Sequence, residues 1–362
     1  MLDPRVLEAM DPWLRGEYGN PSSRSHQHGW RAEEAVEQAR TQVADLVGAQ
    51  SSEIVFTAGT TESNNMVLKG LGGGIVTTAI EHKSIIAPCA WIGMNSGRRI
   101  AFAGVDRTGT VDPGHLAALV DSNVGLVSVM MANNEVGSIQ PVGKIVRMLA
   151  GGALVHSDLA QAISKIPIDL GALGIHFASF SAHKMYGPKG IGALYVRDDI
   201  AHLLTPLVHG GGQERGFRSG TLNVPAIVGF GKACEIAKAE LAVEPARVAG
   251  LRDRLEGLLL VTIPRMVVHG GTNRLSGNLN FSIPCRDINA FMAFAADGVS
   301  LSLGSACMSN SGKSHVLEAM GVDDDEARRS VRIGVGRFNT EEEITKAADI
   351  VVGALDKANN GG

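Results

Sequence analysis

Short apolar runs alternate with helical patterns over roughly the first two thirds of the chain. In residues 30–47, alanine, valine and leucine recur at helical spacing and Gly48 follows them, so a helix ending there is predicted. The apolar runs typical of strands are 53–57, 75–78, 100–103, 126–131, 154–156, 177–180 and 191–196. Further helices are predicted near 58–65, from 84, near 115–120, from 142 and over 225–241. The alternation predicts an α/β fold, with a mostly parallel sheet and helices on both faces.

The pattern changes near residues 243–246, where a proline follows a long helical stretch. We therefore expect a large domain over residues 1–242 and a smaller α+β domain over residues 243–362. Within the smaller domain, residues 330–335 predict a short strand that carries Arg332, a cation suited to binding a carboxylate.

Polar and ionisable residues stand directly after several of the predicted strands. They are Thr60 and Thr61, Glu81 and His82, Asn133 to Glu135, Asp158 to Gln161, and Ser181 to Lys184. In an open α/β sheet, ligands bind beyond the carboxyl ends of the strands. One such residue alone is usually a helix cap or a solvated loop side chain. Several sets at one edge of a sheet favour a functional site.

Composition and charge narrow the possible classes of function. Hydrophobic residues make up 44% of the 362 positions and charged residues 19%, which is typical of a soluble enzyme. The net charge of -4 does not suggest nucleic-acid binding. No apolar run approaches the about 20 residues of a membrane span, and the first residues lack the pattern of a signal peptide. We therefore expect a cytoplasmic protein that binds neither nucleic acid nor membrane.

Three further stretches have compositions that suit binding or catalysis. Gly59 to Thr61 follows a strand and opens a helix, which suits a phosphate, although a simple helix cap is the alternative. Residues 209–221 form a long glycine-rich loop with two arginines, and loops of this length are often functional. Cys307 lies among serines and glycines, where we expect an exposed, mobile thiol. The cysteines lack the spacing of a zinc site or of a disulfide framework, so no metal site is predicted.

These residue types together meet the requirements of pyridoxal phosphate. The cofactor needs a lysine that binds it covalently, for which Lys184 is the candidate, and a carboxylate on its pyridine nitrogen, for which Asp158 is the candidate. The other candidates contact its phosphate, its ring faces or its phenolic oxygen: Thr61, Ser181 and His183 for the phosphate, His82 and Ala160 for the ring, and Gln161 or Asn133 for the oxygen.

Several motifs of the chain occur together in one family. They are Thr61 to Asn64, Glu81 to Lys83, Asn133 to Gly137, Asp158 to Gln161, Ser181 to Tyr195, Gly210 to Thr221, Gly304 to Cys307, and Arg332 with Gly336 to Phe338. In combination they closely resemble a cysteine desulfurase of the class V aminotransferase family, almost from end to end. The resemblance implies the type I pyridoxal-phosphate fold, similar to that of aspartate aminotransferase, and a homodimer that converts L-cysteine to L-alanine.

The same resemblance implies roles for the matching residues. Lys184 would carry the cofactor and move the substrate Cα proton, and Cys307 would attack the substrate sulfur and hold it as a persulfide. The binding roles would be these: Asp158 for the pyridinium, His82 for the ring and the thiol proton, Gln161 for the cofactor oxygen, Thr61, Ser181 and His183 for the phosphate, Arg332 and Asn133 for the substrate carboxylate, and Thr221 for the phosphate of the partner subunit. Sulfur would pass to an iron–sulfur scaffold or another acceptor, for cluster assembly or for thiolation of tRNA or cofactors.

Some departures from the family pattern set further expectations. A first strand and an Ala-Thr-Thr turn normally precede the segment at Asp3, and a longer tail that docks a scaffold normally follows Gly362. We expect weaker substrate affinity and weaker scaffold docking without them, and a changed reach of Cys307 because its segment is short. Two alternatives are a related lyase, such as a selenocysteine lyase, and a catalytically weakened scaffold or sulfur carrier. Alanine production and its dependence on Cys307 would separate these hypotheses.

Overall fold

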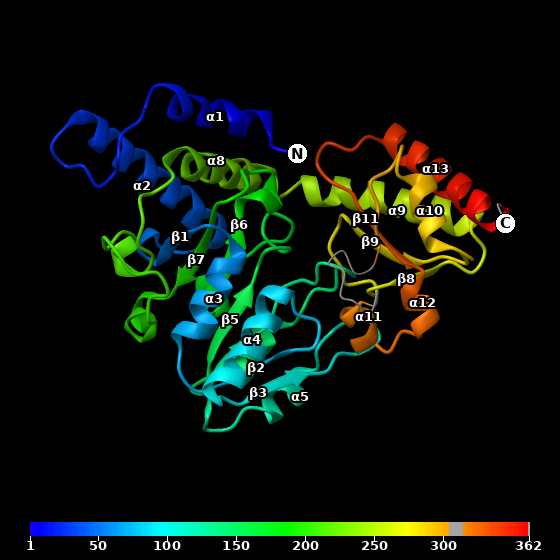
Figure 1. Cartoon of the computed structure of the whole chain (residues 1–362), viewed down its shortest axis with the longest axis horizontal. Helices are drawn as coiled ribbons and strands as arrows, with labels where there is room; N and C mark the ends of the chain where they lie inside the picture. Colours follow the sequence, from blue (N-terminus) through cyan, green and yellow to red (C-terminus); the bar gives the residue numbers. More distant parts are fainter. Residues whose placement is uncertain (304–313, 361–362) are drawn as a thin grey trace. The chain divides into compact units, whose positions relative to one another are not determined.

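The computed structural model describes residues 1–303 and 314–360, which form two compact units (Figure 1). The first unit comprises Met1–Ala103, Pro113–Met131 and Pro141–Leu241. The second unit comprises Gly104–Asp112, Ala132–Gln140 and the chain from Ala242 onward. Two short segments from the first half of the chain therefore belong to the second unit.

A seven-stranded sheet with the order β1-β7-β6-β5-β4-β2-β3 forms the centre of the first unit. Its strands are β1 (Ile54–Thr57), β2 (Gly74–Thr78), β3 (Ile100–Ala103), β4 (Val124–Ser128), β5 (Leu154–Asp158), β6 (Phe177–Ser181) and β7 (Gly192–Val196). Strands β2 to β6 pair in parallel, whereas β7 is antiparallel to both β1 and β6. The mostly parallel sheet expected from the sequence is confirmed.

The predicted strand 126–131 differs most from the structure in its bounds, whereas the other predicted strands match within two residues at each end. The apolar run 126–131 predicts a strand there, but β4 is Val124–Ser128. Beyond its end, Val129 N still donates to His156 O and Met131 N to Asp158 O, so the chain stays extended beside β5. An apolar pattern marks this buried, extended backbone as a whole and does not show where the regular pairing stops.

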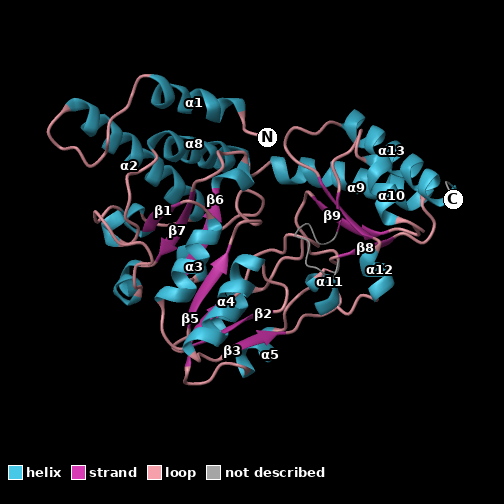
Figure 2. Cartoon of the chain, viewed as in Figure 1, coloured by secondary structure: helices cyan, strands magenta, loops and turns pink. Residues whose placement is uncertain are grey.

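Helices cover both faces of this sheet, as Figure 2 shows. The helices of this unit are α1 (Pro4–Arg15), which packs on α8, and α2 (Gln27–Val47), α3 (Thr60–Gly70), α4 (Lys83–Ser96), α5 (Pro113–Ala118), α6 (Val142–Met148), α7 (Leu170–Leu173) and α8 (Val224–Glu240), with short turns η1 (Ser51–Glu53), η2 (Ala182–Met185), η3 (Asp198–Leu203) and η4 (Glu214–Gly216). On one face, Phe230 of α8 packs edge-on against Phe56 and Phe180. On the other, Val55 joins a buried cluster with side chains of α3 and α4. The neighbours Val55 and Phe56 point to opposite faces because side chains alternate along a strand.

The second unit is built on a four-stranded antiparallel sheet with the order β10-β11-β9-β8. Its elements are α9 (Glu244–Thr262), β8 (Val267–His269), β9 (Asn278–Ser282), α10 (Ile288–Ala295), β10 (Ser302–Leu303), α11 (His315–Ala319), α12 (Asp324–Arg328), β11 (Ser330–Gly334) and α13 (Glu341–Asn360). Leu255, Phe281, Phe291 and Val351 belong to one buried cluster that joins the sheet to α9, α10 and α13. Across the described parts of both units, no helix has the length and apolar character needed to cross a membrane.

Candidate active site

The ends of two strands bring hydroxyl groups to the start of helix α3. Strand β6 ends at Ser181, and β1, which runs in the same direction, leads through Gly59 into α3. Ser181 Oγ accepts a hydrogen bond from Thr60 N at 2.7 Å and lies 2.6 Å from Thr60 Oγ1. Thr61 is exposed on the same first turn. N–H groups and a positive dipole end at a helix start favour an anion, so this corner suits a phosphate.

The close approach of β7 to the start of α3 requires glycine at position 192. A Cβ atom there would lie 2.5 Å from Phe180 O and 2.7 Å from Gly59 Cα, far inside normal contact distance. Gly59 has a φ of +150° and leaves Ser181 Oγ 3.4 Å from the place that a Cβ would take. The backbone therefore forms an open cradle beside the two hydroxyls, which fits a group as compact as a phosphate.

Asp158, the last residue of β5, places a buried carboxylate at the same sheet edge. Its side chain accepts hydrogen bonds at 2.8 Å from Asn64 Nδ2 and from Ala160 N. Burial raises the pKa of Asp158, while these bonds and the charges of His82 and Lys184 act in the opposite direction. A protonated ring nitrogen, such as that of the pyridoxal ring, would further stabilise the negative charge of this carboxylate.

Two polar residues link Asp158 to His82. Asn64 Nδ2 donates both to Asp158 Oδ2 at 2.8 Å and to Ser84 Oγ at 2.9 Å, and Ser84 Oγ lies 2.8 Å from His82 Nδ1. The backbone N–H of Ser84 also donates to His82 Nδ1, at 3.1 Å. Because Nδ1 accepts this bond, the hydrogen of the neutral imidazole is on Nε2. The network orients the ring and selects its tautomer.

Glu81 supports the turn that carries His82. It is fully buried, and its Oε1 accepts from Thr78 Oγ1 at 2.9 Å and from Met130 N at 2.8 Å. These bonds join the end of β2 to the chain beyond β4. Burial raises the pKa of Glu81 to about 8, and the charge of Asp158 acts in the same direction. Glu81 therefore holds a proton at neutral pH and keeps a second negative charge away from Asp158.

Lys184 lies on η2, directly after β6, and its side chain is exposed. Tyr186, with a φ of +63°, ends this turn, and Gly187 N donates to Ala182 O. His183 is exposed beside Lys184, whereas Gln161 is half-buried and its Oε1 accepts from Lys165 Nζ at 3.3 Å. An accessible lysine thus stands near a buried carboxylate on which its charge acts.

The glycine-rich loop 209–221 is fastened to the first turn of α3. Arg218 Nε donates to Glu62 Oε1 at 2.8 Å, and Glu62 Oε2 accepts from Ala58 N at 3.0 Å. Thr221, at the end of the loop, is exposed. The loop that was expected to be functional therefore contacts the first turn of α3 through Arg218, while the side chain of Thr221 is exposed.

The remaining candidates belong to the second unit or lie outside the described residues. Asn133 is buried, and its Oδ1 accepts from Glu135 N at 2.8 Å and from Val136 N at 3.0 Å. Arg332, on β11, donates from Nη1 to Asn134 O at 2.7 Å. The two residues expected to bind the substrate carboxylate are therefore joined through one turn. Cys307 lies outside the described residues.

The linking roles of Asn64 and Ser84 were not predicted from the sequence. The sequence held a signal for Asn64, because it is on the same buried side of helix α3 as Met66, Val67 and Leu68. A polar residue at such a position needs a buried partner. Ser84 stands two residues after His82, in the first turn of α4, and His82 itself caps that helix by accepting from Ser84 N.

Comparison with known proteins shows the family of the chain. Residues 1–346 match the family described as Aminotransferase class-V. A relative named Cysteine desulfurase IscS, from Anaeromyxobacter dehalogenans (strain 2CP-C), is 47% identical over 356 residues, covering 96% of this chain and 88% of the relative. A solved structure of a NifS-like protein has a TM-score of 0.91 and 38% identity, covering 98% of this chain and 96% of that one. The NifS-like protein from Rickettsia africae ESF-5 has a TM-score of 0.88 and 34% identity, covering 98% and 97%. The chain therefore belongs to the class-V aminotransferases and, within them, to the pyridoxal-phosphate-dependent cysteine desulfurases.

Proposed function

We propose that Lys184, Asp158, His82 and Cys307 carry out the removal of sulfur from L-cysteine in this chain. The observation that supports this most is the buried Asp158 carboxylate, which is linked through Asn64 and Ser84 to His82 and lies within the electrostatic reach of Lys184. Pyridoxal phosphate, when bound, supplies an electron sink for the bonds at the substrate Cα.

The residues of the first unit have binding and proton-transfer roles in this proposal. Lys184 holds the cofactor covalently and, once released by the substrate, accepts the Cα proton at Nζ. Asp158 would accept a hydrogen bond from the pyridine nitrogen. Ser181, His183 and Thr61 would hold the phosphate, and Gln161 would donate to the phenolic oxygen. His82 would cover the ring with Nε2 as its protonated nitrogen. Its Nδ1 already accepts from Ser84 N, so taking up a thiol proton there would break that bond.

The sulfur-transfer step belongs to Cys307. Its thiolate forms a bond to the substrate sulfur while the Cβ–S bond breaks, and the electron pair of that bond remains with the three-carbon product. This product takes up a proton and leaves as L-alanine, so one thiol and one L-cysteine become one persulfide and one alanine. Arg332 and Asn133 bind the substrate carboxylate. The domain over residues 243–362 thereby carries the nucleophile and Arg332, whereas Asn133 and the residues that would hold the cofactor are in residues 1–242.

Assembly and sulfur delivery extend the same proposal. We propose a cytoplasmic homodimer in which Thr221 of each subunit contacts the cofactor phosphate of its partner. The relative from Anaeromyxobacter dehalogenans carries the name IscS, and we propose that the persulfide of this chain likewise serves iron–sulfur cluster assembly or another sulfur acceptor.

The proposed role of Lys184 is tested by comparing Lys184→Ala with Lys189→Ala, which removes another exposed lysine close by in the sequence. We expect Lys184→Ala to lose the visible absorption of covalently bound pyridoxal phosphate and to form alanine from L-cysteine about 100-fold or more slowly. The control variant should keep both. Borohydride reduction and peptide mapping of the unaltered protein should place the cofactor on Lys184, and its attachment elsewhere would overturn the assignment.

A further inference from the structure

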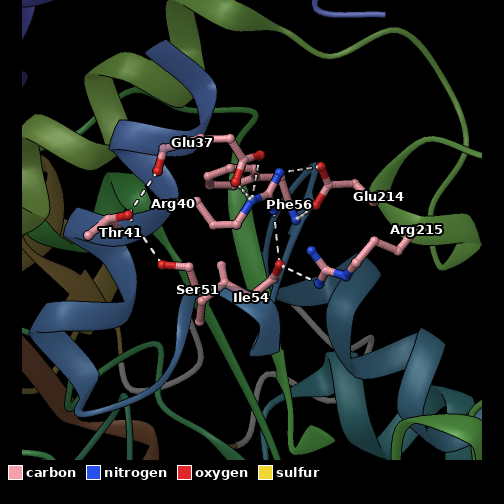
Figure 3. Close-up of polar contacts among 8 residues, drawn as sticks. All are labelled: Glu37, Arg40, Thr41, Ser51, Ile54, Phe56, Glu214 and Arg215. Carbon is pink, nitrogen blue, oxygen red and sulfur yellow. Dashed lines mark hydrogen bonds and ion pairs between the residues drawn. The ribbon is translucent and has the colours of Figure 1, made fainter. Parts of the chain in front are cut away.

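Side chains take the place of a neighbouring strand along the outer edge of β1. Strand β1 is the last strand of the sheet and pairs with β7 on one side. On the other side, Ile54 O accepts from Arg40 Nη1 and from Arg215 Nη2, both at 2.9 Å, and Phe56 N donates to Glu214 Oε2 at 2.7 Å (Figure 3). Edge strands normally leave such groups to solvent or to another chain. Here Arg40 and the loop 209–221 satisfy them.

Arg40 and Glu214 form a buried, two-pronged ion pair beneath the loop. Arg40 Nη1 and Nη2 each donate to one carboxylate oxygen of Glu214 at 2.8 Å, and the two side chains are only 5% and 1% exposed. The Arg40 guanidinium also lies 4.7 Å from the centre of the Phe56 ring. With planar, bidentate geometry, such a pair holds its partners in one relative orientation.

The backbone of the loop is strained where it meets this ion pair. Glu214 and Arg215 have φ values of +50° and +56°, the left-handed region that non-glycine residues rarely adopt. This conformation directs Glu214 to Arg40 and Phe56, and it directs Arg215 to Ile54 (Figure 3). Strain of this kind persists only where surrounding contacts impose it, and it marks segments whose geometry matters for function.

Hydrogen bonds also fix the backbone of the loop between Glu214 and its last residues. Phe217 N donates to Glu214 O, and Gly220 N donates to Gln213 Oε1 at 2.9 Å. Arg218 pairs with Glu62 at the start of α3. Thr221 follows directly. The loop is therefore preformed within a single chain, with its last residue presented outward.

We propose that Arg40 and Glu214 are positioning residues for Thr221, acting on the active site of the partner subunit. The inference rests on the proposed function, in which Thr221 contacts the cofactor phosphate across the dimer. By locking the loop onto β1, the ion pair sets Thr221 before the subunits meet, so less conformational freedom is lost on contact with the phosphate. Loss of the pair should therefore weaken cofactor retention in the partner and not in the same chain.

The test uses heterodimers that contain one intact Lys184. The double substitution Arg40→Met with Glu214→Leu removes both buried charges together, because a single substitution would leave one charge uncompensated. In the first arrangement, one chain carries the double substitution together with Lys184→Ala, and its partner is unaltered. The only intact site is then in the partner, and it receives Thr221 from an altered loop. In the second arrangement, one chain carries Lys184→Ala and the other carries the double substitution, so the intact site receives Thr221 from an unaltered loop. Glu37→Gln, which alters an exposed carboxylate on Arg40, is the matched control.

The readout is the rate of pyridoxal phosphate release from the intact site after dilution, together with hydrogen exchange at Phe56 N. We expect release about 10-fold to 100-fold faster in the first arrangement, as for loss of a hydrogen bond to a charged group, and a near-normal rate in the second. Exchange at Phe56 should increase in the altered chain of both. Equal release rates in the two arrangements would overturn the proposal, since general destabilisation would affect both.

Thr221→Ala in the same two arrangements separates the inference from the function on which it rests. If Thr221→Ala speeds release only from the partner site and the Arg40/Glu214 variant does not, the positioning role is wrong while the role of Thr221 stands. If Thr221→Ala has no effect across the dimer, the proposed contact of Thr221 is itself wrong, and the positioning role fails with it.

Discussion

Buried polar residues with defined partners set the chemistry of the candidate site. Asp158 lies where burial alone would favour a neutral carboxyl group, yet the proposed pairing with a pyridinium requires a charged one. Asn64 supports the charge with one donor, and its own Oδ1 is buried without a hydrogen-bond partner among the residues that the structure describes. The same amide orients Ser84, and through it His82. One asparagine therefore couples the two residues expected on the nitrogen and on the face of the ring.

Glu81 gives a prediction for the pH dependence of stability. Its pKa is raised from the ordinary value of 4.5 to about 8, so the folded chain holds this proton more tightly than the unfolded chain. The corresponding stabilisation is fully present below about pH 4.5 and is lost as the pH rises through about 8. Between these values the free energy of unfolding should fall by up to about 1.4 kcal/mol per pH unit from this group.

In E81Q this contribution is absent, so its free energy of unfolding should decline less steeply from pH 5 to pH 8. Asp158, whose pKa is also raised, contributes a decline that both proteins share. Urea unfolding of the cofactor-free proteins at several pH values measures the difference. Parallel curves for the two proteins would show that Glu81 is already ionised in the folded chain.

Among the elements, the position of β7 between β1 and β6 creates the phosphate corner. Because β7 is antiparallel to both, β1 and β6 end at the same edge, and Thr60 meets Ser181 there. A glycine at position 192 permits this approach. The corner is thus a consequence of strand order, which places residues far apart in the chain side by side.

Gly192→Ala should therefore disturb both the sheet and the corner. The added Cβ would contact backbone atoms of Phe180 and Gly59, so we expect a loss of about 1–3 kcal/mol in the free energy of unfolding and weaker phosphate binding. Gly250→Ala is the control, because among the described residues no atom outside the adjacent residues and backbone of α9 lies within 4 Å of its Cβ position. There the same substitution should stabilise the chain by about 0.5–1 kcal/mol, since alanine favours helix. Similar urea unfolding curves for the two variants would contradict this account.

For the molecule as a whole, sulfur transfer requires one reactive thiol among several. Cys89, Cys234 and Cys285 are buried. Burial raises the pKa of Cys89 to about 12 and raises the pKa values of Cys234 and Cys285 as well. These thiols therefore stay protonated and unreactive at pH 8.

We accordingly predict that iodoacetamide at pH 8 modifies Cys307 before any other cysteine in the native protein, as mapped by mass spectrometry. Cys307→Ser should abolish this labelling and slow alanine formation about 100-fold or more, since the nucleophile is lost. Cys285→Ala should leave both unchanged. Preferential labelling of a buried cysteine would contradict the prediction, and alanine formation that is independent of Cys307 would favour a lyase.

The sequence by itself determined the elements whose signals are local. The strand predicted at 100–103 is β3 as observed, and the helix predicted to end at Gly48 does so, with Gly48 in the left-handed conformation. These elements could be predicted because apolar periodicity and the conformational freedom of glycine depend only on neighbouring residues. Their alternation along the chain then predicted the mostly parallel sheet. Helix α1 was not predicted, although Asp3 caps its start, Pro4 stands in its first turn and its buried residues Val6 and Met10 are four positions apart.

Only the tertiary structure decided which polar residues meet. Asn64 and Asp158 are 94 positions apart, and Arg40 and Glu214 are 174 apart. Their contacts follow from the strand order β1-β7-β6-β5, which no local pattern specifies. The motifs therefore indicated the chemistry of Lys184 and Asp158, whereas their supporting residues depend on long-range packing. A buried polar group needs a hydrogen-bond partner, but the local sequence around that group does not show which distant residue supplies it.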